Sequence, residues 1–412
     1  ELNQIQRLGE WPIPNPEINS DIDPSNYVVT GDITGPYVTN STISIFIQSR
    51  NEKNEHVNHN DAVFKVRLVG TAMISVPVMS IGNGKYKAII NIQHAGEYLI
   101  EILLLTVEGT GTSPRFVVRR SNSYYVNKLI YNSEKVIRIV SDNRTHMKYK
   151  KCTRGDSKSG RWVSMTECRL PFCTISNQST LDSLQINDPI GLNKDSVYVP
   201  DNCYYHLFSP QEVFKCFNRK NYVNLGFSGD SVGREQMQNI QMILSYYNPQ
   251  MKMPKLKPSD KLENTLNNIN LQWNHGPNKQ DVTMIHMSEP HVLASGGDMI
   301  SIIQQQTLKL RNRVKSCRFA KAKCIVYINP QVQREIDHTS ARLSSNNFYK
   351  HITPQRMSAL TNALRKEAEL QNVSILDGAS ITKGHWFGSW DGLHYSEYFS
   401  HYKKKNGDHT PV

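Results

Sequence analysis

The sequence predicts a chain of two parts, an all-β sandwich followed by an α/β domain in which a parallel sheet carries helices on both faces. Short alternating segments separated by turn residues occupy residues 22–120, and strand-like segments alternate with helix-like ones after residue 221. The 412 residues also exceed what one hydrophobic core usually organises. Hydrophobic residues make up 38% and charged residues 20% of the chain, a balance that excludes an intrinsically disordered protein.

The first part follows an N-terminal extension over residues 1–21. Its segments TISIFIQS, AVFKVRLVG, YKAIINIQ and EYLIEILLL alternate apolar and polar side chains, as half-buried strands do. Gly82-Asn83-Gly84 predicts a hairpin turn between two of them. This spacing resembles the second half of a filamin-type immunoglobulin-like repeat, which implies an immunoglobulin/filamin-like β-sandwich over residues 22–120. The polar residues 121–150 are expected to form a connector.

Residues 151–412 are expected to form the α/β domain, with a cysteine-rich start. Alternating strands and helices favour a parallel sheet, in which reactive groups gather in loops at the carboxyl ends of the strands. The apolar strands are predicted at 222–227, 282–287, 323–330 and 373–378, and the helices at 232–247, 298–314 and 354–371.

Several features indicate the secretory pathway. Seven cysteines include a cluster at Cys152, Cys168, Cys173, Cys203 and Cys216. Without a CxxC pair or paired histidines, the cluster favours disulfides over zinc, with one cysteine left over or paired to another chain. Sequons of the form N-x-[ST] occur at Asn40, Asn143, Asn177 and Asn372.

No apolar run reaches the roughly 18 residues of a membrane span. Because the chain starts at Glu1 rather than at methionine, a signal peptide or anchor can have preceded it. We therefore expect either a secreted protein or a Golgi-lumen protein whose N-terminal anchor is missing here.

The net charge of +12 and the isoelectric point near 9.2 raise the question of nucleic acid binding. The Lys and Arg residues are scattered, apart from YKKKN after residue 401, and no basic stripe interleaved with aromatics occurs. The charge pattern thus argues against nucleic acid and fits a diffuse field that concentrates an acidic glycan.

The strongest chemical signal is Ser231 in NLGFSGDSVGREQ. This serine falls between a predicted strand and a predicted helix, so its hydroxyl would lie on a tight turn beside the helix amino terminus. A serine needs an imidazole base that a carboxylate orients. Of fourteen histidines, only His394 has an aspartate three residues earlier, Asp391 in WDGLHY. We predict these three residues to be the catalytic triad.

A second GDS tripeptide ends at Ser157, in a polar stretch without the flanking strand and helix. Its context predicts no catalysis. The same stretch spells Arg154-Gly155-Asp156, the tripeptide by which extracellular ligands bind integrins, but the tripeptide needs an exposed, curved loop, and we expect no integrin binding here.

The run GRWV at 160–163, the cysteine-bounded segment ending in CYYHLFSPQEVFKCF, FSGDSVGREQ and WDGLHY together resemble the PC-esterase branch of SGNH/GDSL-type acyl esterases. This group contains the NXPE (neurexophilin and PC-esterase domain) family. The resemblance implies a three-layer SGNH hydrolase-like α/β domain, with Ser231 as nucleophile, His394 as base and then acid, and Asp391 as its orienting carboxylate.

The resemblance also implies that Arg234 lies near the active site, where it can hold an acyl oxygen or brace the loop. Gly229, Asn274 and Gly276 are candidates for the oxyanion hole or substrate contacts, although NHGPNK can also be a simple turn. His286 and His291, beside a predicted strand, are either cleft residues or hydrogen-bonded structural histidines.

The expected reaction has two steps, in which Ser231 takes an acyl group from a donor, with acetyl as the expected group, and passes it to water or to a sugar hydroxyl. The first acceptor gives an esterase and the second an O-acyltransferase acting on a glycan or glycoprotein. We expect no metal and no tightly bound cofactor, with acetyl-CoA as a candidate donor. The competing interpretation is a non-catalytic secreted adhesion, matrix or neurexophilin-like ligand protein, with a cell-surface or matrix protein partner, that retains the fold.

Overall fold

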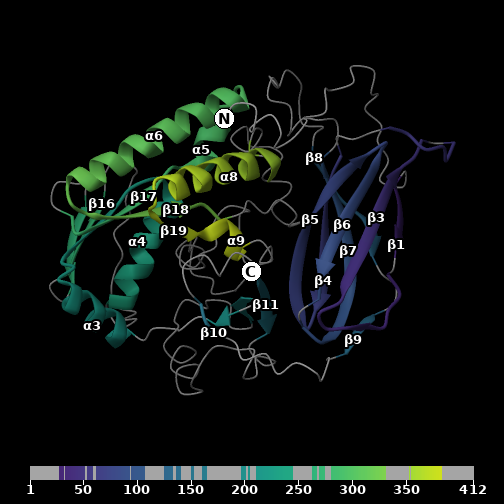
Figure 1. The fold of residues 1–412 in the computed structure, drawn as a ribbon, viewed down its shortest axis with the longest axis horizontal. Helices are drawn as coiled ribbons and strands as arrows, with labels where there is room; N and C mark the ends of the chain where they lie inside the picture. The colour runs from purple at the N-terminus through teal and green to yellow at the C-terminus, as the bar shows by residue number, and fades with distance from the viewer. Residues whose placement is uncertain are drawn as a thin grey trace, which may run out of the picture.

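The computed structural model describes residues 27–106, 125–140, 150–152, 160–164, 196–200, 203–204, 210–244, 262–273, 280–330 and 352–382, with gaps of one to three residues inside some of these ranges. Figure 1 places strands of the N-terminal half at one end of the molecule and the helices of the C-terminal half at the other. Within the described residues, no helix is long and apolar enough to cross a membrane.

An eleven-stranded sheet organises the N-terminal half in the order β1-β3-β6-β5-β4-β7-β9-β2, with β8, β11 and β12 attached at its sides. Apart from the parallel pair β2–β9, its pairings are antiparallel. The strands are β1 (Tyr27–Gly31), β2 (Tyr37–Val38), β3 (Thr42–Ser49), β4 (Val63–Gly70), β5 (Ala72–Gly82), β6 (Lys85–Asn91), β7 (Gly96–Thr106), β8 (Tyr125–Asn132), β9 (Ile137–Val140), β11 (Gly160–Ser164) and β12 (Ser196–Pro200).

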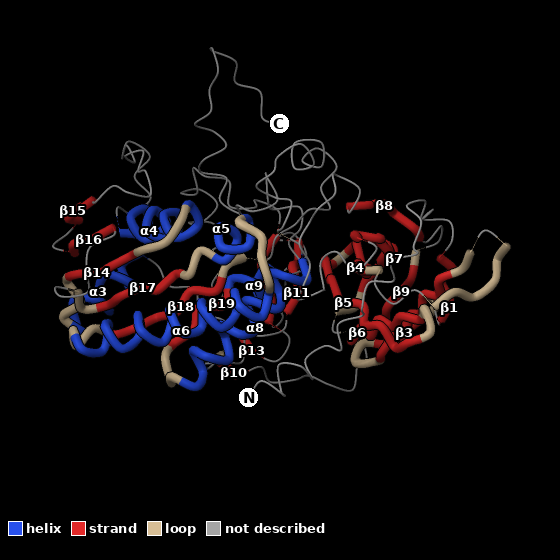
Figure 2. The backbone as a smooth tube through the Cα atoms, turned by 90° about the horizontal axis from the view of Figure 1, so that it is seen from above, coloured by secondary structure: helices blue, strands red, loops and turns tan. Residues whose placement is uncertain are grey.

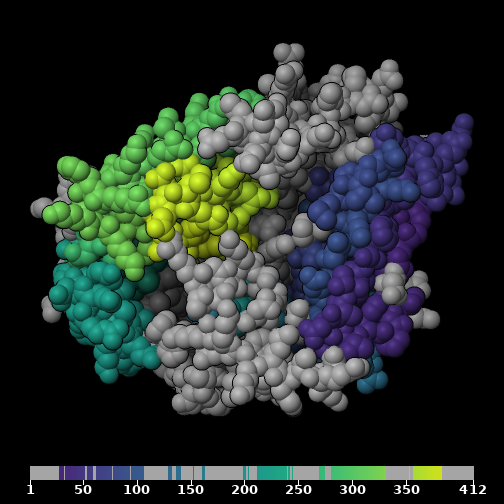
Figure 3. All heavy atoms as spheres, in the orientation of Figure 1, coloured from purple at the N-terminus to yellow at the C-terminus, as the bar shows by residue number. Residues whose placement is uncertain are grey.

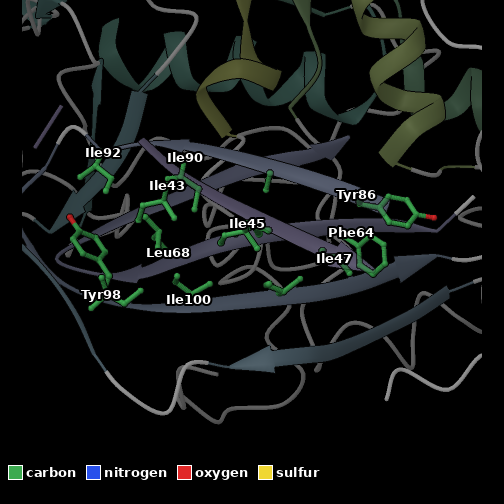
Figure 4. Packing of buried hydrophobic residues seen from close by; sticks show 14 of the residues in the cluster. Ile43, Ile45, Ile47, Phe64, Leu68, Tyr86, Ile90, Ile92, Tyr98 and Ile100 are labelled. Carbon is green, nitrogen blue, oxygen red and sulfur yellow. The ribbon is translucent and has the colours of Figure 1, made fainter. Parts of the chain in front are cut away.

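Alternation along these strands builds one apolar core. In β3, Ile43, Ile45 and Ile47 are fully buried, and every second residue of β6 and β7 joins them. Figure 4 shows these isoleucines interleaved with Phe64, Leu68, Tyr86, Ile90, Ile92, Tyr98 and Ile100. The predicted hairpin turn is confirmed, because Asn83 and Gly84 take positive φ between β5 and β6.

Residues expected to be a connector contribute strands to this sheet. β8 and β9 lie in the predicted connector, and both pair with β7. Beyond the connector, β11 pairs with β5 and also with β12, which joins β12 to the sheet. From β11, the Trp162 indole N–H donates to the carbonyl oxygen of Ile381 at 2.9 Å, which links this sheet to the C-terminal half.

A six-stranded sheet in the order β15-β16-β14-β17-β18-β19 organises the C-terminal half. Pairing is parallel between all neighbours except β15 and β16, which are antiparallel. The strands are β14 (Asn224–Phe227), β15 (Leu262–Leu266), β16 (Ile269–Trp273), β17 (Val282–His286), β18 (Lys323–Ile328) and β19 (Ser374–Asp377). A separate two-stranded sheet pairs β10 (Lys150–Lys151) with β13 (Cys203–Tyr204).

Helices pack on this sheet through two apolar clusters. One joins α5 (Glu289–Ala294), α6 (Met299–Phe319) and α8 (Pro354–Leu370) to β17, β18 and β19. The other joins α3 (Pro210–Lys220) and α4 (Ser231–Leu244) to β14 and β16. Figure 2 shows α4 on one side of the strands and α6 and α8 on the other, and α6 and α8 adjoin on the surface in Figure 3. The short α9 (Gly378–Thr382) follows β19.

The predicted fold class is wrong: it was a three-layer SGNH hydrolase-like α/β domain, with a parallel sheet and helices on both faces, preceded by an all-β immunoglobulin/filamin-like sandwich. The C-terminal sheet is mixed, since β15 runs antiparallel to β16. Strands contain more of the described residues than helices, and most of them belong to the largely antiparallel eleven-stranded sheet. That sheet also takes in β11 and β12 from well beyond residue 120, because their pairing with β5 is decided by tertiary contacts.

The expectation of disulfides is confirmed. Cys152 bonds to Cys203, two members of the predicted cluster, and Cys317 at the end of α6 bonds to Cys324 in β18. Cys216 is exposed and free. Cys168 and Cys173 lie outside the described residues. Two disulfides fit a secreted or lumenal protein.

Candidate active site

The strand order reverses direction at β14. From β14 the chain passes to β15 and β16 on one side of it, and then to β17, β18 and β19 on the other. Ligands of open sheets with parallel strands bind at such a reversal, beyond the carboxyl ends of the strands. The residues that follow Phe227, the last residue of β14, are therefore the place to look for a site.

Ser231 stands at this place as the first residue of α4, four residues after Phe227. Between them Gly229 takes a φ of 131°, a backbone conformation that residues other than glycine rarely adopt. The strand-turn-helix setting predicted from the sequence is thus confirmed. It puts Ser231 at the positive end of the α4 dipole. The N–H groups of this first turn have no hydrogen-bond acceptor within the helix.

Asp230 shapes the start of α4. Its Oδ1 accepts from the Val232 N–H at 3.0 Å, and its carbonyl oxygen accepts from the Arg234 N–H at 3.0 Å. The Asp230 side chain is buried, and its Oδ2 has no hydrogen-bond partner among the described residues. Sequence reasoning used this aspartate only as a letter of the GDS tripeptide; the structure makes it the helix cap.

His286, at the carboxyl end of β17, lies directly against the turn. A Cβ on Gly229 would come within 2.2 Å of the His286 Nδ1, and a Cβ on Gly233 within 3.2 Å of the same atom. The ring is fully buried, and its Nδ1 lies 3.4 Å from Asp230 Oδ1. Of the two interpretations of His286, the structure supports the buried, contact-making one.

The other side of the His286 ring meets two polar groups. Its Nε2 contacts Asn329 Oδ1, at the carboxyl end of β18, and lies 3.6 Å from Glu289 Oε2. Glu289 is fully buried, and burial raises the pKa of its carboxyl, with the neighbouring His286 acting in the opposite direction. The Asn329 backbone N–H donates to Glu289 Oε1 at 3.4 Å.

His291 lies at the rim of this cluster. Its side chain is 49% exposed, and its Nε2 is 3.7 Å from Asp230 Oδ2. It belongs to α5, which begins three residues after β17 ends. His291 therefore borders the nucleophile turn from the solvent side, whereas His286 borders it from within the protein.

The remaining predicted residues divide by location. Arg234 is partly buried in the first turn of α4, close in sequence to Ser231 as predicted. Asn274 and Gly276 follow Trp273, the end of β16, but lie outside the described residues. Asp391 and His394 also lie outside them, so the completion of the triad stays a prediction.

Two of the four sequons are described. Asn40 and Asn372 are exposed, and both occupy turns with positive φ. Asn143 and Asn177 lie outside the described residues, as do Ser157 and the Arg154-Gly155-Asp156 tripeptide.

Sequence reasoning missed Glu289 and Asn329 as members of the site. A signal for both exists in the sequence, since each follows within three residues of a buried strand whose carboxyl end faces the same edge as Ser231. Neither residue has a motif of its own, so only the pairing of β14, β17 and β18 brings them together.

Comparisons with known proteins add little to this geometry. No protein-family model matches the chain, and no curated protein matches it. Among solved structures, the chain is similar to a crystal structure of a candidate glycoside hydrolase from Bacteroides vulgatus, with 8% identity and a TM-score of 0.19 over 80% of this chain and 53% of that one. The chain thus spans about half the length of that protein, and a likeness this weak supports no argument about fold or function.

Proposed function

We propose that the C-terminal half is a serine-dependent acyl esterase or O-acyltransferase with Ser231 as its nucleophile. One observation carries the proposal: Ser231 begins α4 immediately after the strand at which the sheet order reverses, on a turn opened by Gly229. Nucleophilic serines of open α/β sheets lie on such a tight strand-to-helix turn, with helix N–H groups beside the developing oxyanion.

In the proposed first step, the Ser231 Oγ attacks the carbonyl carbon of an acyl donor while His394 takes the hydroxyl proton. The new bond is an ester between Oγ and the acyl carbon, and the donor's leaving group departs with the proton from His394. Asp391 orients the imidazole. In the second step, water or a sugar hydroxyl gives its proton to His394 and attacks the ester, which releases the acyl group and restores the serine.

The chemical class of the substrate follows from charge, compartment and resemblance. The net charge of +12 favours acidic glycans, and two disulfides fit a secreted or lumenal protein. The resemblance of FSGDSVGREQ and WDGLHY to the NXPE family suggests O-acetyl groups on carbohydrate, with acetyl-CoA as a candidate donor. The proposed location is the extracellular space or the Golgi lumen.

The test is labelling of the intact protein with a fluorophosphonate probe, followed by intact mass and by sequencing of the labelled peptide. We expect one adduct on the peptide that contains Ser231, none in Ser231→Ala, and slow labelling in His394→Ala. Ser157→Ala is the matched control, because it removes the serine of the other GDS tripeptide and should label normally. Labelling that persists in Ser231→Ala refutes the assignment, and a wild-type protein that never labels favours the non-catalytic ligand protein.

A further inference from the structure

A cluster of buried polar side chains surrounds His286 in the part of the C-terminal half that the structure describes. Three strands end around this ring: β14 is followed by Asp230, β17 ends in His286 itself, and β18 is followed by Asn329. The His286 and Asn329 side chains are fully buried, and Asp230 is nearly so. Burying polar side chains costs free energy, so we ask which part of the chain these side chains hold in place.

Packing identifies the turn before α4 as the part that His286 supports. The ring occupies the volume that a Cβ of Gly229 or Gly233 would fill, so it touches the chain on both sides of Ser231. Its opposite edge is held by Asn329 and Glu289, and the Arg313 guanidinium donates to the His286 carbonyl oxygen at 2.8 Å. The His286 ring is therefore packed on both edges, and it has little room to move away from the turn.

A polar contact adds to this support. The His286 Nδ1 lies 3.4 Å from Asp230 Oδ1, although it makes no hydrogen bond to any of the described residues. The same Oδ1 caps the Val232 N–H. A shift of the ring would thus move the cap and, with it, the first residue of α4.

We propose that His286 is a positioning residue for Ser231, filling the space beneath the Gly229–Asp230 turn and placing its Nδ1 against the Asp230 carboxylate. This inference rests on the proposed function for its catalytic consequence, but its structural part does not. His286 is not the base that activates Ser231, because its ring is fully buried and all of its contacts hold it within the protein. It acts through Asp230 on the geometry of the serine.

Paired substitutions separate the polar contact from packing. Asn keeps a polar nitrogen near the position of Nδ1 but loses ring volume, Leu keeps volume but has no polar atom, and Gln moves the polar nitrogen to the position of Nε2. We expect the maximal labelling rate of Ser231 to fall about 100-fold in His286→Leu, with the half-saturating probe concentration unchanged, and to stay within about tenfold of wild type in His286→Asn. His286→Gln should be slower than His286→Asn. If His286→Leu does not fold, the comparison of Asn with Gln still decides.

Gln280→Leu is the matched control. Gln280 is a buried polar residue that fills the space beside Gly226 of β14. Its side-chain oxygen accepts from the Thr283 hydroxyl at 2.8 Å. It lies away from the Ser231 turn, so its loss should lower the thermal stability and leave the labelling rate unchanged. Equal losses of rate in Gln280→Leu and His286→Leu would show that His286 contributes only general stability.

A second measurement keeps this inference independent of catalysis. Hydrogen exchange by mass spectrometry on the peptide that spans residues 224–236 should be faster in His286→Leu than in wild type or Gln280→Leu. Unchanged exchange at this peptide overturns the positioning role. If wild type does not label but the exchange result holds, the proposed function fails and the positioning role stands.

Discussion

Gly229→Ala tests the whole arrangement beneath the nucleophile turn with one methyl group. Alanine at a φ of 131° costs about 1–3 kcal/mol of backbone strain. The new Cβ would also lie 2.2 Å from His286 Nδ1, and this ring is clamped from its other side, so overpacking adds about 1–3 kcal/mol. We expect the free energy of unfolding of the C-terminal half to fall by about 2–6 kcal/mol.

Gly297→Ala supplies the comparison within the same half of the chain. Gly297 has a φ of 103°, but the nearest atom to its added Cβ would be 3.9 Å away, in ordinary contact. It should therefore cost only the strain, about 1–3 kcal/mol. Urea unfolding followed by tryptophan fluorescence measures both, and an excess of about 2 kcal/mol for Gly229→Ala moves the midpoint by about a further 1 M. Equal midpoints for the two variants would refute the claim that His286 packs rigidly against the turn.

Three further predictions concern charge and modification. Burial would raise the pKa of Asp377, but the hydrogen bonds and the charge of Arg365 lower this pKa below its ordinary value. The stability that the Asp377 carboxylate contributes is therefore lost as pH falls below about 4. Asp377→Asn should reduce this loss in a plot of the free energy of unfolding against pH. Burial, and then the charge of Arg161, lower the pKa of His94 to about 4. The free energy of unfolding should therefore fall by up to about 3 kcal/mol as pH is lowered from 6.5 to 4. This fall should be absent in His94→Gln. Asn372 is exposed, and protein made in a secretory host should lose one glycan in Asn372→Gln, as seen by mass before and after glycosidase.

Local patterns predicted the elements of this protein well. The strands over β14, β17, β18 and β19 and the helices α4, α6 and α8 begin and end within a few residues of the predicted ranges, α6 excepted at its C-terminal end, since apolar periodicity reflects which face each segment buries. The same information cannot fix partners. β11 reaches β5 across almost ninety positions of sequence, and β15 pairs antiparallel with β16 in an otherwise parallel sheet, which is why the predicted fold class failed.

The candidate site was predictable to the same degree. Ser231 could be located because its turn is a local feature of strand, glycine and helix. The support beneath it could not, since His286, Glu289 and Asn329 meet only through the register of three neighbouring strands. A buried polar residue at a strand end is a weak signal alone, and it becomes informative once the strand order places several at one edge.

The helix that Ser231 begins takes its side-chain cap from Asp230. A helix amino terminus commonly uses a serine as its cap, and that use would explain the serine without any catalysis. Here the capping oxygen for the Val232 N–H belongs to Asp230, one residue earlier. We therefore expect Ser231→Ala to change the free energy of unfolding by less than about 0.5 kcal/mol. Asp230→Ala removes the cap and the carboxylate beside His286 Nδ1, and it should cost about 1–3 kcal/mol. Urea unfolding of the two variants measures both values. A Ser231→Ala loss as large as that of Asp230→Ala would assign the serine to the architecture of the turn, whereas a small loss agrees with the proposed role of Ser231 as nucleophile.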